Sequence, residues 1–236
     1  MLVHEITMKE FKEGLKKTKT LIVPFGTVEA HGAHLPLSTD TIIIWEAVKE
    51  AVKKQPAFVA PPIHYGVCTS TGAHPGTLGI RPGTLRRIAK DIVRDGYTKG
   101  LRDFILISGH GGSIHSSAMR EAGETLISEL DNIRLAVLTI YDITKKELSG
   151  IVQTPDDSHA GEMETSLILF LRPNLVKGRG KKERPCLPRP FIVKDKVKYW
   201  LGAIDGDPTK ATKKKGELAF ALMNEKIQGL IKEIGR

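Results

Sequence analysis

Short apolar runs alternate with longer amphipathic segments along this sequence, and this alternation restricts the fold more than any other feature. The runs lack the polar alternation of a half-exposed strand and lie at residues 20–25, 57–63, 103–108 and 134–140. Segments of helical length surround them, at residues 6–17, 39–54, 81–97, 109–130 and 159–173, with one more helix near the C-terminal end. Unbroken apolar strands separated by helices are typical of a parallel sheet buried on both faces. The sequence therefore predicts one domain over residues 1–236, an α/β three-layer α/β/α sandwich with a mostly parallel central sheet.

The loops that follow the predicted strands carry most of the candidate functional residues. In a parallel sheet the ligand site lies beyond the carboxyl ends of the strands. Glu29, His74 and His110 each lie in a loop after one of these strands. We therefore expect the three loops to meet at one edge of the sheet.

Near the N-terminal end of the sequence, Thr7 and Glu10 have the spacing of a capping box, which predicts the start of the first helix.

The net charge of +9 favours an anionic partner, although a solvated basic surface explains it equally well. Much of the excess lies in two basic runs, residues 177–184 and 210–215. Aromatic residues make up only 6% of the chain and do not interleave with these runs, which argues against nucleic acid as the partner. A small anionic substrate therefore stays open as a partner, beside the solvated basic surface.

Cysteine usage and hydropathy indicate a cytoplasmic protein that does not enter a membrane. Cys68 and Cys186 are the two cysteines, and their spacing fits neither a disulfide framework nor a thiolate metal motif. No apolar run approaches the roughly 20 residues that a membrane span needs. The N-terminal residues show no signal-peptide pattern.

Residues 26–40 place a glutamate, two histidines and an aspartate in a short segment punctuated by glycine and proline. Glu29 and His31 are two positions apart, so they project to the same side of an extended segment. Carboxylate oxygen and imidazole nitrogen are ligands for zinc, manganese or iron(II), and Asp40 has two oxygens with which to bridge two ions. The alternative is that Asp40 caps a helix and the histidines are hydrogen-bonded core residues. The combination favours a metal site.

Two further motifs supply candidate residues. The turn at 108–113 offers His110 as a ligand, or its glycine amides as an anion site. The segment at 159–166 places His159 and Glu162 three apart on one face of a helical turn, where they suit proton transfer, with Glu164 pointing away. An ordinary helix cap explains that segment equally well. His115 reads as a structural residue behind His110, and a nucleophilic pairing of Cys68 with His74 or His110 is a minor alternative.

Three blocks of this sequence together resemble the creatininase (creatinine amidohydrolase) family: "PFGTVEAHGAHLPLSTD", "ILISGHGGS" and "HAGEMETS". The resemblance implies a dinuclear metal centre in which Glu29 and His110 hold one ion, His31 holds the other and Asp40 bridges them. Creatininase takes a further glutamate two residues after the turn histidine, where this chain has Gly112. The resemblance therefore implies Glu162 as the replacement ligand and catalytic partner, and His159 as the catalytic proton donor.

The departures from creatininase bear on the substrate. Neither Trp45 nor Trp200 is placed near the third block, and His74 replaces a phenylalanine of the family, so a creatinine ring would lose its stacking partners. The archaeal-type formamide hydrolases of the family fit better. They deformylate 2-amino-5-formylamino-6-ribosylaminopyrimidin-4(3H)-one 5′-monophosphate in riboflavin and coenzyme F420 biosynthesis. That resemblance implies two divalent ions, with iron(II) favoured over zinc or manganese, and a homo-oligomer, a dimer or larger. The alternatives are a cyclic-amide hydrolase, a peptide-processing protease of the family, and a phosphate- or nucleotide-binding module.

Overall fold

The sheet contains four parallel strands in the order β2-β1-β3-β4, in a computed structural model that describes residues 1–236. The strands are β1 (Thr20–Phe25), β2 (Phe58–Val59), β3 (Asp103–Ser108) and β4 (Arg134–Thr139). Phe25 pairs with Ser108, and Ser108 pairs with Thr139. The three longer strands therefore end together at one edge of the sheet, where the loops that follow them meet.

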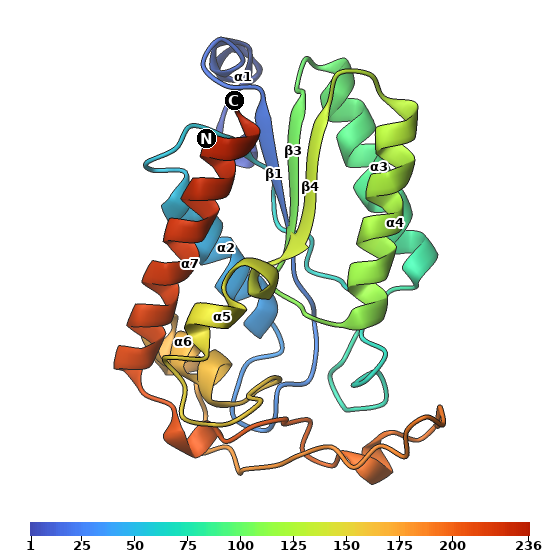
Figure 1. The fold of residues 1–236 in the computed structure, drawn as a ribbon, viewed down its shortest axis with the longest axis vertical. Coiled ribbons are helices and arrows are strands. Elements are labelled where there is room, and N and C mark those ends of the chain that lie inside the picture. Colours follow the sequence, from blue (N-terminus) through green and yellow to red (C-terminus); the bar gives the residue numbers. More distant parts are fainter.

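Helices cover both faces of the sheet, and the predicted three-layer α/β/α fold is confirmed (Figure 1). One face carries α2 (Thr39–Ala51), α6 (Glu162–Leu171) and α7 (Lys213–Ile234). The other face carries α3 (Pro82–Thr98) and α4 (Ser113–Glu129). Two short helices complete the set: α1 (Met8–Gly14) before β1, and α5 (Lys145–Leu148) after β4. None of the helices combines the length and apolarity that crossing a membrane requires.

Side chains of the central strands alternate between two cores. Ile22 and Ile105 point into the core beside α2, α6 and α7, whereas Leu21 and Phe104 point into the core beside α3 and α4. Successive residues of a strand face opposite sides of its sheet. Because both sides are covered, every position of β1 and β3 is buried, and this is why their sequences are unbroken apolar runs.

The capping box at the first helix is confirmed, but several boundaries differ from the prediction. Thr7 and Glu10 form the reciprocal cap of α1. The strand predicted over 57–63 is only two residues long, since Pro61 and Pro62 have no N–H to donate to a ladder. The helix predicted over 159–173 begins three residues later, at Glu162. This last shift moves His159 off the helix and changes which glutamate faces the site.

An irregular arm, residues 177–207, crosses the carboxyl edge of the sheet (Figure 1, orange). Lys177 at its start donates its N–H to the carbonyl of His34, and Gly206 near its end pairs with Glu183. The arm brings a distant part of the sequence over the loops that follow β1 and β3. It thereby forms one wall of the cavity described below.

Candidate metal centre

The carboxylate of Asp40 lies between two histidines. Asp40 is in the first turn of α2, and its Oδ1 is 3.1 Å from His31 Nε2 while its Oδ2 is 3.1 Å from His110 Nδ1. Its side chain is 2% exposed, and the hydroxyl of Thr27 donates a hydrogen bond to Oδ2. Asp40 thus has one oxygen for each of two neighbouring groups, which is the arrangement of a bridging ligand.

The first group consists of Glu29 and His110. Glu29 Oε2 lies 2.9 Å from His110 Nδ1, and the other oxygen of Glu29 accepts a hydrogen bond from the hydroxyl of Thr71. Glu29 Oε2 and His110 Nε2 are both buried without a hydrogen-bond partner. Buried polar atoms are nearly always hydrogen-bonded, so an unpartnered carboxylate oxygen at this place fits a cation ligand. The sulfur of Cys68 lies in the same group, within 4.8 Å of the nearest ligand atoms of both residues.

The second group consists of His31 and Glu164. His31 Nδ1 donates to the backbone carbonyl of Glu29 over 3.0 Å, so Nε2 is the nitrogen that gives up its proton when the ring becomes neutral. That Nε2 faces Asp40 Oδ1 and, at 3.6 Å, Glu164 Oε2. A metal-binding histidine usually donates its other ring N–H to a carbonyl or carboxylate, which fixes the tautomer that binds the metal. His31 has this arrangement.

The electrostatics of the cluster favour cations. Burial lowers the pKa of His31, but the carboxylates of Asp40, Glu164 and Glu29 have the larger, opposite effect. The resulting pKa is about 10. The pKa of His110 is likewise raised, since Glu29 and Asp40 outweigh its burial. Burial raises the pKa of Glu164 to about 7. Without an ion, the histidines hold protons that neutralise the carboxylates.

The residues present fit two divalent ions. Zinc bonds to nitrogen or oxygen are about 2.0–2.2 Å long, so two donors on one ion lie no farther apart than about 4.4 Å. The separations of 2.9–3.6 Å within the two groups satisfy that limit. The second group, His31 with Asp40 and Glu164, also forms a set of three close ligand atoms. The structure therefore brings together Glu29, His31, Asp40 and His110, as the sequence predicted.

Glu162 does not join this cluster, and its predicted role as ligand or catalytic partner is corrected by its position. Its carboxylate accepts hydrogen bonds from the backbone N–H groups of Gln153 and Thr154 and from the Thr154 hydroxyl. Its other close partner is the ammonium group of Lys215 on α7, at 2.5 Å. Glu164, two positions further along α6, reaches the site instead and accepts a hydrogen bond from the Tyr141 hydroxyl over 2.9 Å.

His159 lies beside the second group. Its ring packs on that of His31, with 4.1 Å between ring centroids, and its Nε2 is 2.7 Å from the carbonyl oxygen of Ala30. A carbonyl only accepts, so Nε2 carries the proton and Nδ1 is free. Burial, and then the charge of His31, lowers the pKa of His159 to about 4. The ring is therefore neutral near pH 7 and can accept a proton at Nδ1.

Trp200 also reaches the site, contrary to the sequence prediction. The arm carries it to His159, with ring centroids 5.4 Å apart, and its indole N–H donates to the carbonyl of Ile204. His74 supports it from the other side, since its Nε2 lies 2.5 Å from the carbonyl oxygen of Trp200. Nothing in the local sequence around Trp200 signals this contact, because it depends on the path of the whole arm.

His115 is a structural residue behind His110, as predicted. Its Nδ1 accepts the N–H of Val67 over 3.1 Å, and its Nε2 lies 3.2 Å from the hydroxyl oxygen of Ser108. Burial, with the charge of His110, lowers its pKa to about 3, so the ring stays neutral. Gly112 has a steric role towards His110, because a Cβ at position 112 would overlap the His110 ring.

A cavity of about 1090 Å³ opens over the cluster. Glu29, Asp40, His110, His159 and Glu164 line its floor, and Trp200 lines its wall. Two cations, Lys145 from α5 and Arg189 from the arm, also border it. Gly111 and Gly112 line the same cavity.

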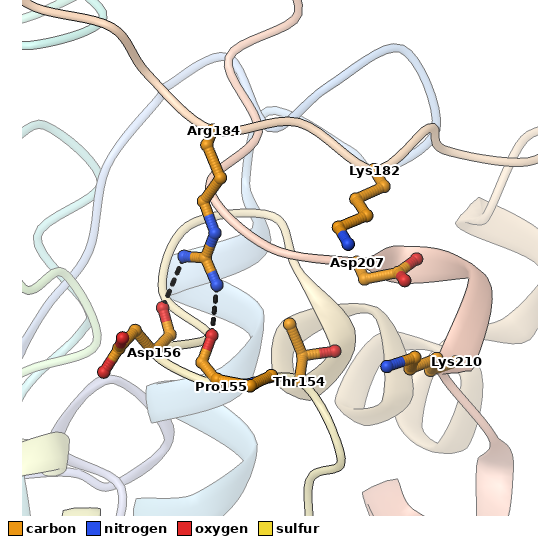
Figure 2. A pocket seen from close by; sticks show the side chains of 7 residues that line it. All are labelled: Thr154, Pro155, Asp156, Lys182, Arg184, Asp207 and Lys210. Atoms are coloured by element: carbon orange, nitrogen blue, oxygen red, sulfur yellow. Dashed lines mark hydrogen bonds between the residues drawn. The ribbon is translucent and has the colours of Figure 1, made fainter.

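A smaller basic cavity of about 410 Å³ lies next to it, and Figure 2 shows its lining. Lys182 and Arg184 come from the first basic run and Lys210 from the second, so the fold brings the two runs together. The guanidinium of Arg184 donates to the carbonyl oxygens of Pro155 and Asp156, which belong to the wall shared by both cavities. Arg184 therefore holds that wall in place.

Fold and site together define the chain as a parallel α/β protein with a candidate two-ion centre at the carboxyl edge of its sheet. The family model described as "Creatininase: Creatinine amidohydrolase" matches residues 4–231, and the chain belongs to this family of hydrolases. It is 26% identical to the creatinine amidohydrolase of Pseudomonas putida, over 99% of this chain and 96% of that protein. It is 30% identical to the mycofactocin precursor peptide peptidase of Mycolicibacterium smegmatis, over 86% of this chain and 80% of the relative.

A third relative, the 3-dehydro-scyllo-inosose hydrolase of Thermotoga maritima, is 30% identical over 86% of this chain and 69% of its own length. Among solved structures, a crystal structure of creatinine amidohydrolase superposes with a TM-score of 0.85 and 25% identity, covering 100% of this chain and 98% of that chain. Structures of similar fold include a manganese form of creatininase and a zinc-zinc form of a creatininase variant.

Proposed function

We propose that this protein is a dinuclear-metal amidohydrolase that removes formate from 2-amino-5-formylamino-6-ribosylaminopyrimidin-4(3H)-one 5′-monophosphate, a step of riboflavin and coenzyme F420 biosynthesis. The observation that carries the metal chemistry is the sharing of Asp40 between the two groups, Glu29 with His110 and His31 with Glu164. Two divalent ions held there, with iron(II) favoured, would supply Lewis acidity and lower the pKa of a water towards about 7.

The chain's own residues account for the proton transfers of a formamide hydrolysis. The water oxygen bonds to the formyl carbon, and the neutral imidazole of His159 accepts the water proton at Nδ1, because Nε2 is bound to Ala30. The same nitrogen then delivers that proton to the departing nitrogen as the C–N bond breaks, giving formate and an amine. General acid–base catalysis of this kind contributes about 10²–10⁴-fold. Gly111 and Gly112 line the cavity, and we assign their N–H groups as donors to the developing oxyanion.

Two cations among the carboxylates of the cavity lining are the contacts that we assign to an anionic substrate. Lys145 and Arg189 border the cavity that contains the metal cluster, and each can bind a phosphate. The cavity volume of about 1090 Å³ is slightly above the usual range of small-ligand sites, roughly 300–1,000 Å³, and accommodates a nucleotide-sized molecule. The net charge of +9 would also draw an anionic substrate towards the protein.

The test is an anaerobic assay with iron(II) and the formylamino-pyrimidine nucleotide, followed by detection of formate. We expect formate in stoichiometric amounts with the amine product, and none from the Asp40→Asn variant. In parallel reactions, creatinine is assayed for creatine and a panel of short peptides for cleavage. Turnover of creatinine or peptides without formate release from the nucleotide would overturn the proposed substrate, and full activity of Asp40→Asn would overturn the proposed centre.

One observation favours a second candidate, a creatininase-type cyclic-amide hydrolase. Trp200 lines the cavity beside His159, so this chain does offer an aromatic ring to a flat substrate. The sequence argument against creatinine depended on the absence of such a ring. The creatinine arm of the same experiment decides between the two substrates.

We also propose that the protein forms a homo-oligomer through the arm. Phe191 and Ile192 are 75% and 94% exposed, an unusual exposure for two adjacent large apolar residues. Burial of these side chains against another copy would remove them from water. Sedimentation analysis of the wild type and of a Phe191→Ser, Ile192→Ser variant tests this: we expect a dimer or larger for the wild type and dissociation of the variant. A monomeric wild type would contradict it.

A further inference from the structure

We infer that the sulfur of Cys68 is a third protein ligand of the ion held by Glu29 and His110. This inference rests on the metal centre proposed above and concerns only one of its two ions. It makes that ion's site selective for a thiophilic divalent cation such as zinc, cobalt or iron(II), whereas the other site keeps only nitrogen and oxygen ligands.

The position of Cys68 is the first step of the argument. Its Sγ lies within 4.8 Å of the ligand atoms of Glu29 and His110, and the residue is only 7% exposed. The loop that carries it is fixed on both sides. Before it, the N–H of Val67 donates to His115 Nδ1 over 3.1 Å, and after it, the hydroxyl of Thr71 donates to Glu29. The sulfur is therefore held beside the cluster and does not depend on a mobile loop to reach it.

An independent observation indicates a cation at that point. Glu29 Oε2 is a buried carboxylate oxygen without a hydrogen-bond partner, in a residue that is 2% exposed. His110 faces this oxygen with its Nδ1, at 2.9 Å. A cysteine that served only for packing would leave this oxygen unexplained. A cation bound between Glu29, His110 and Cys68 explains both the unpartnered oxygen and the position of the sulfur.

The chemistry of the donors then determines which cations fit. A set of one carboxylate, one imidazole and one thiolate suits zinc, cobalt(II) and iron(II), and it disfavours magnesium and manganese, which prefer oxygen. The thiol proton is released to solvent when the sulfur binds the ion. The group of His31, Asp40 and Glu164 contains no sulfur. The two ions of the centre would therefore have different preferences.

Cobalt(II) titration followed by absorption spectroscopy tests the ligand directly. The starting protein is the Cys186→Ser variant, which removes the exposed cysteine and leaves Cys68 as the sole thiol. We expect a thiolate-to-cobalt charge-transfer band in the near ultraviolet that saturates at one cobalt per chain. The band should be lost when Cys68→Ser is added. Cobalt affinity at one of the two sites should also fall, by at least the roughly 10–100-fold that is typical when a residue that only hydrogen-bonds to a metal ligand is replaced.

A second measurement avoids any effect of the Cys68 substitution on folding. X-ray absorption of the zinc-loaded Cys186→Ser protein should contain a sulfur shell at about 2.3 Å, at half a sulfur per zinc for two bound ions. A spectrum with only nitrogen and oxygen neighbours, or a charge-transfer band absent from the cobalt protein, would overturn the inference. Formate release by either protein tests the proposed function separately, since a sulfur-free centre can still be active.

Discussion

At the residue scale, two glutamates that lie two positions apart perform different tasks. Residues i and i+2 of a helix do not share a face, and α6 sends Glu164 to the cluster and Glu162 to Lys215. We expect Glu164→Gln to bind about one divalent ion per chain fewer than the wild type and to lose most activity. Glu162→Gln is the matched control and should keep both ions. Metal analysis after gel filtration measures this, and equal metal content of the two variants would contradict it.

Glu162 should instead affect stability in a pH-dependent way. Burial raises its pKa, but hydrogen bonds from Lys215, Thr154 and Gln153 outweigh burial, so the pKa lies below the ordinary value of 4.5. A carboxyl with a lowered folded pKa contributes stability above the unfolded pKa, and this contribution is lost as the pH falls through the folded value. We expect Glu162→Gln to unfold about 1–3 kcal/mol more easily near neutral pH.

The difference should begin to shrink below about pH 4.5, where the carboxyl of the unfolded chain takes up a proton, and it should go on shrinking until the pH has fallen through the lower folded value. Urea denaturation of both proteins across this range measures the difference in unfolding free energy. Lys215→Met should show a loss of similar sign near neutral pH, because it leaves Glu162 buried without its ion partner. A difference between the proteins that is constant from neutral to acid pH would show that the charge of Glu162 plays no part.

At the element scale, the start of α6 positions Glu164. Asp157 accepts hydrogen bonds from the N–H groups of Glu162 and Met163, each over 2.8 Å, and so caps the helix from outside it. We expect Asp157→Ala to cost about 1–2 kcal/mol of stability, as lost helix caps do, and to weaken metal binding at the His31 group. Asp156→Asn is the control, since it keeps a residue that tolerates the positive φ of 51° at that position. Thermal unfolding with metal titration measures both effects, and unchanged binding in Asp157→Ala would refute the link.

The elements that the sequence predicted well are those with strong local signals. β1 and β3 match their apolar runs, and the Thr7–Glu10 pair marks the start of α1. The apolar content of residues 57–63 predicted a longer strand, whereas β2 ends at Val59, before Pro61 and Pro62. Spacing could not decide between Glu162 and Glu164, because the answer depends on a helix start three residues later than predicted, fixed by the Asp157 cap.

At the scale of the whole molecule, the centre is assembled from segments that are far apart in the sequence. Glu29, Asp40, His110 and Glu164 come from four segments around one edge of the sheet, and the arm adds Trp200. The first three could be placed from the sequence because each follows or begins an element at that edge. Trp200 could not, because no local pattern records where a long irregular arm crosses the fold.

Such a centre should couple metal binding to the stability of the entire domain. Ions that bind only the folded chain stabilise it by about 2.7 kcal/mol per site at a free concentration 100-fold above Kd. For a chain of this size, 1 kcal/mol shifts Tm by roughly 2–4 °C, so each site should contribute about 5–10 °C. The protonated histidines of the ion-free protein compete with the metal, so the shift should grow as the pH rises and they lose their protons more easily.

Calorimetry of the wild type before and after chelation, and after reloading with iron(II) or zinc, measures this shift. Asp40→Asn removes the ligand shared by both groups and should respond to neither chelator nor metal. Glu164→Gln affects only one group and should retain about half of the wild-type shift. An Asp40→Asn protein that still gains the full shift on metal addition would show that the ions bind elsewhere on the molecule, and that the buried cluster around Asp40 is held together by its own hydrogen bonds alone.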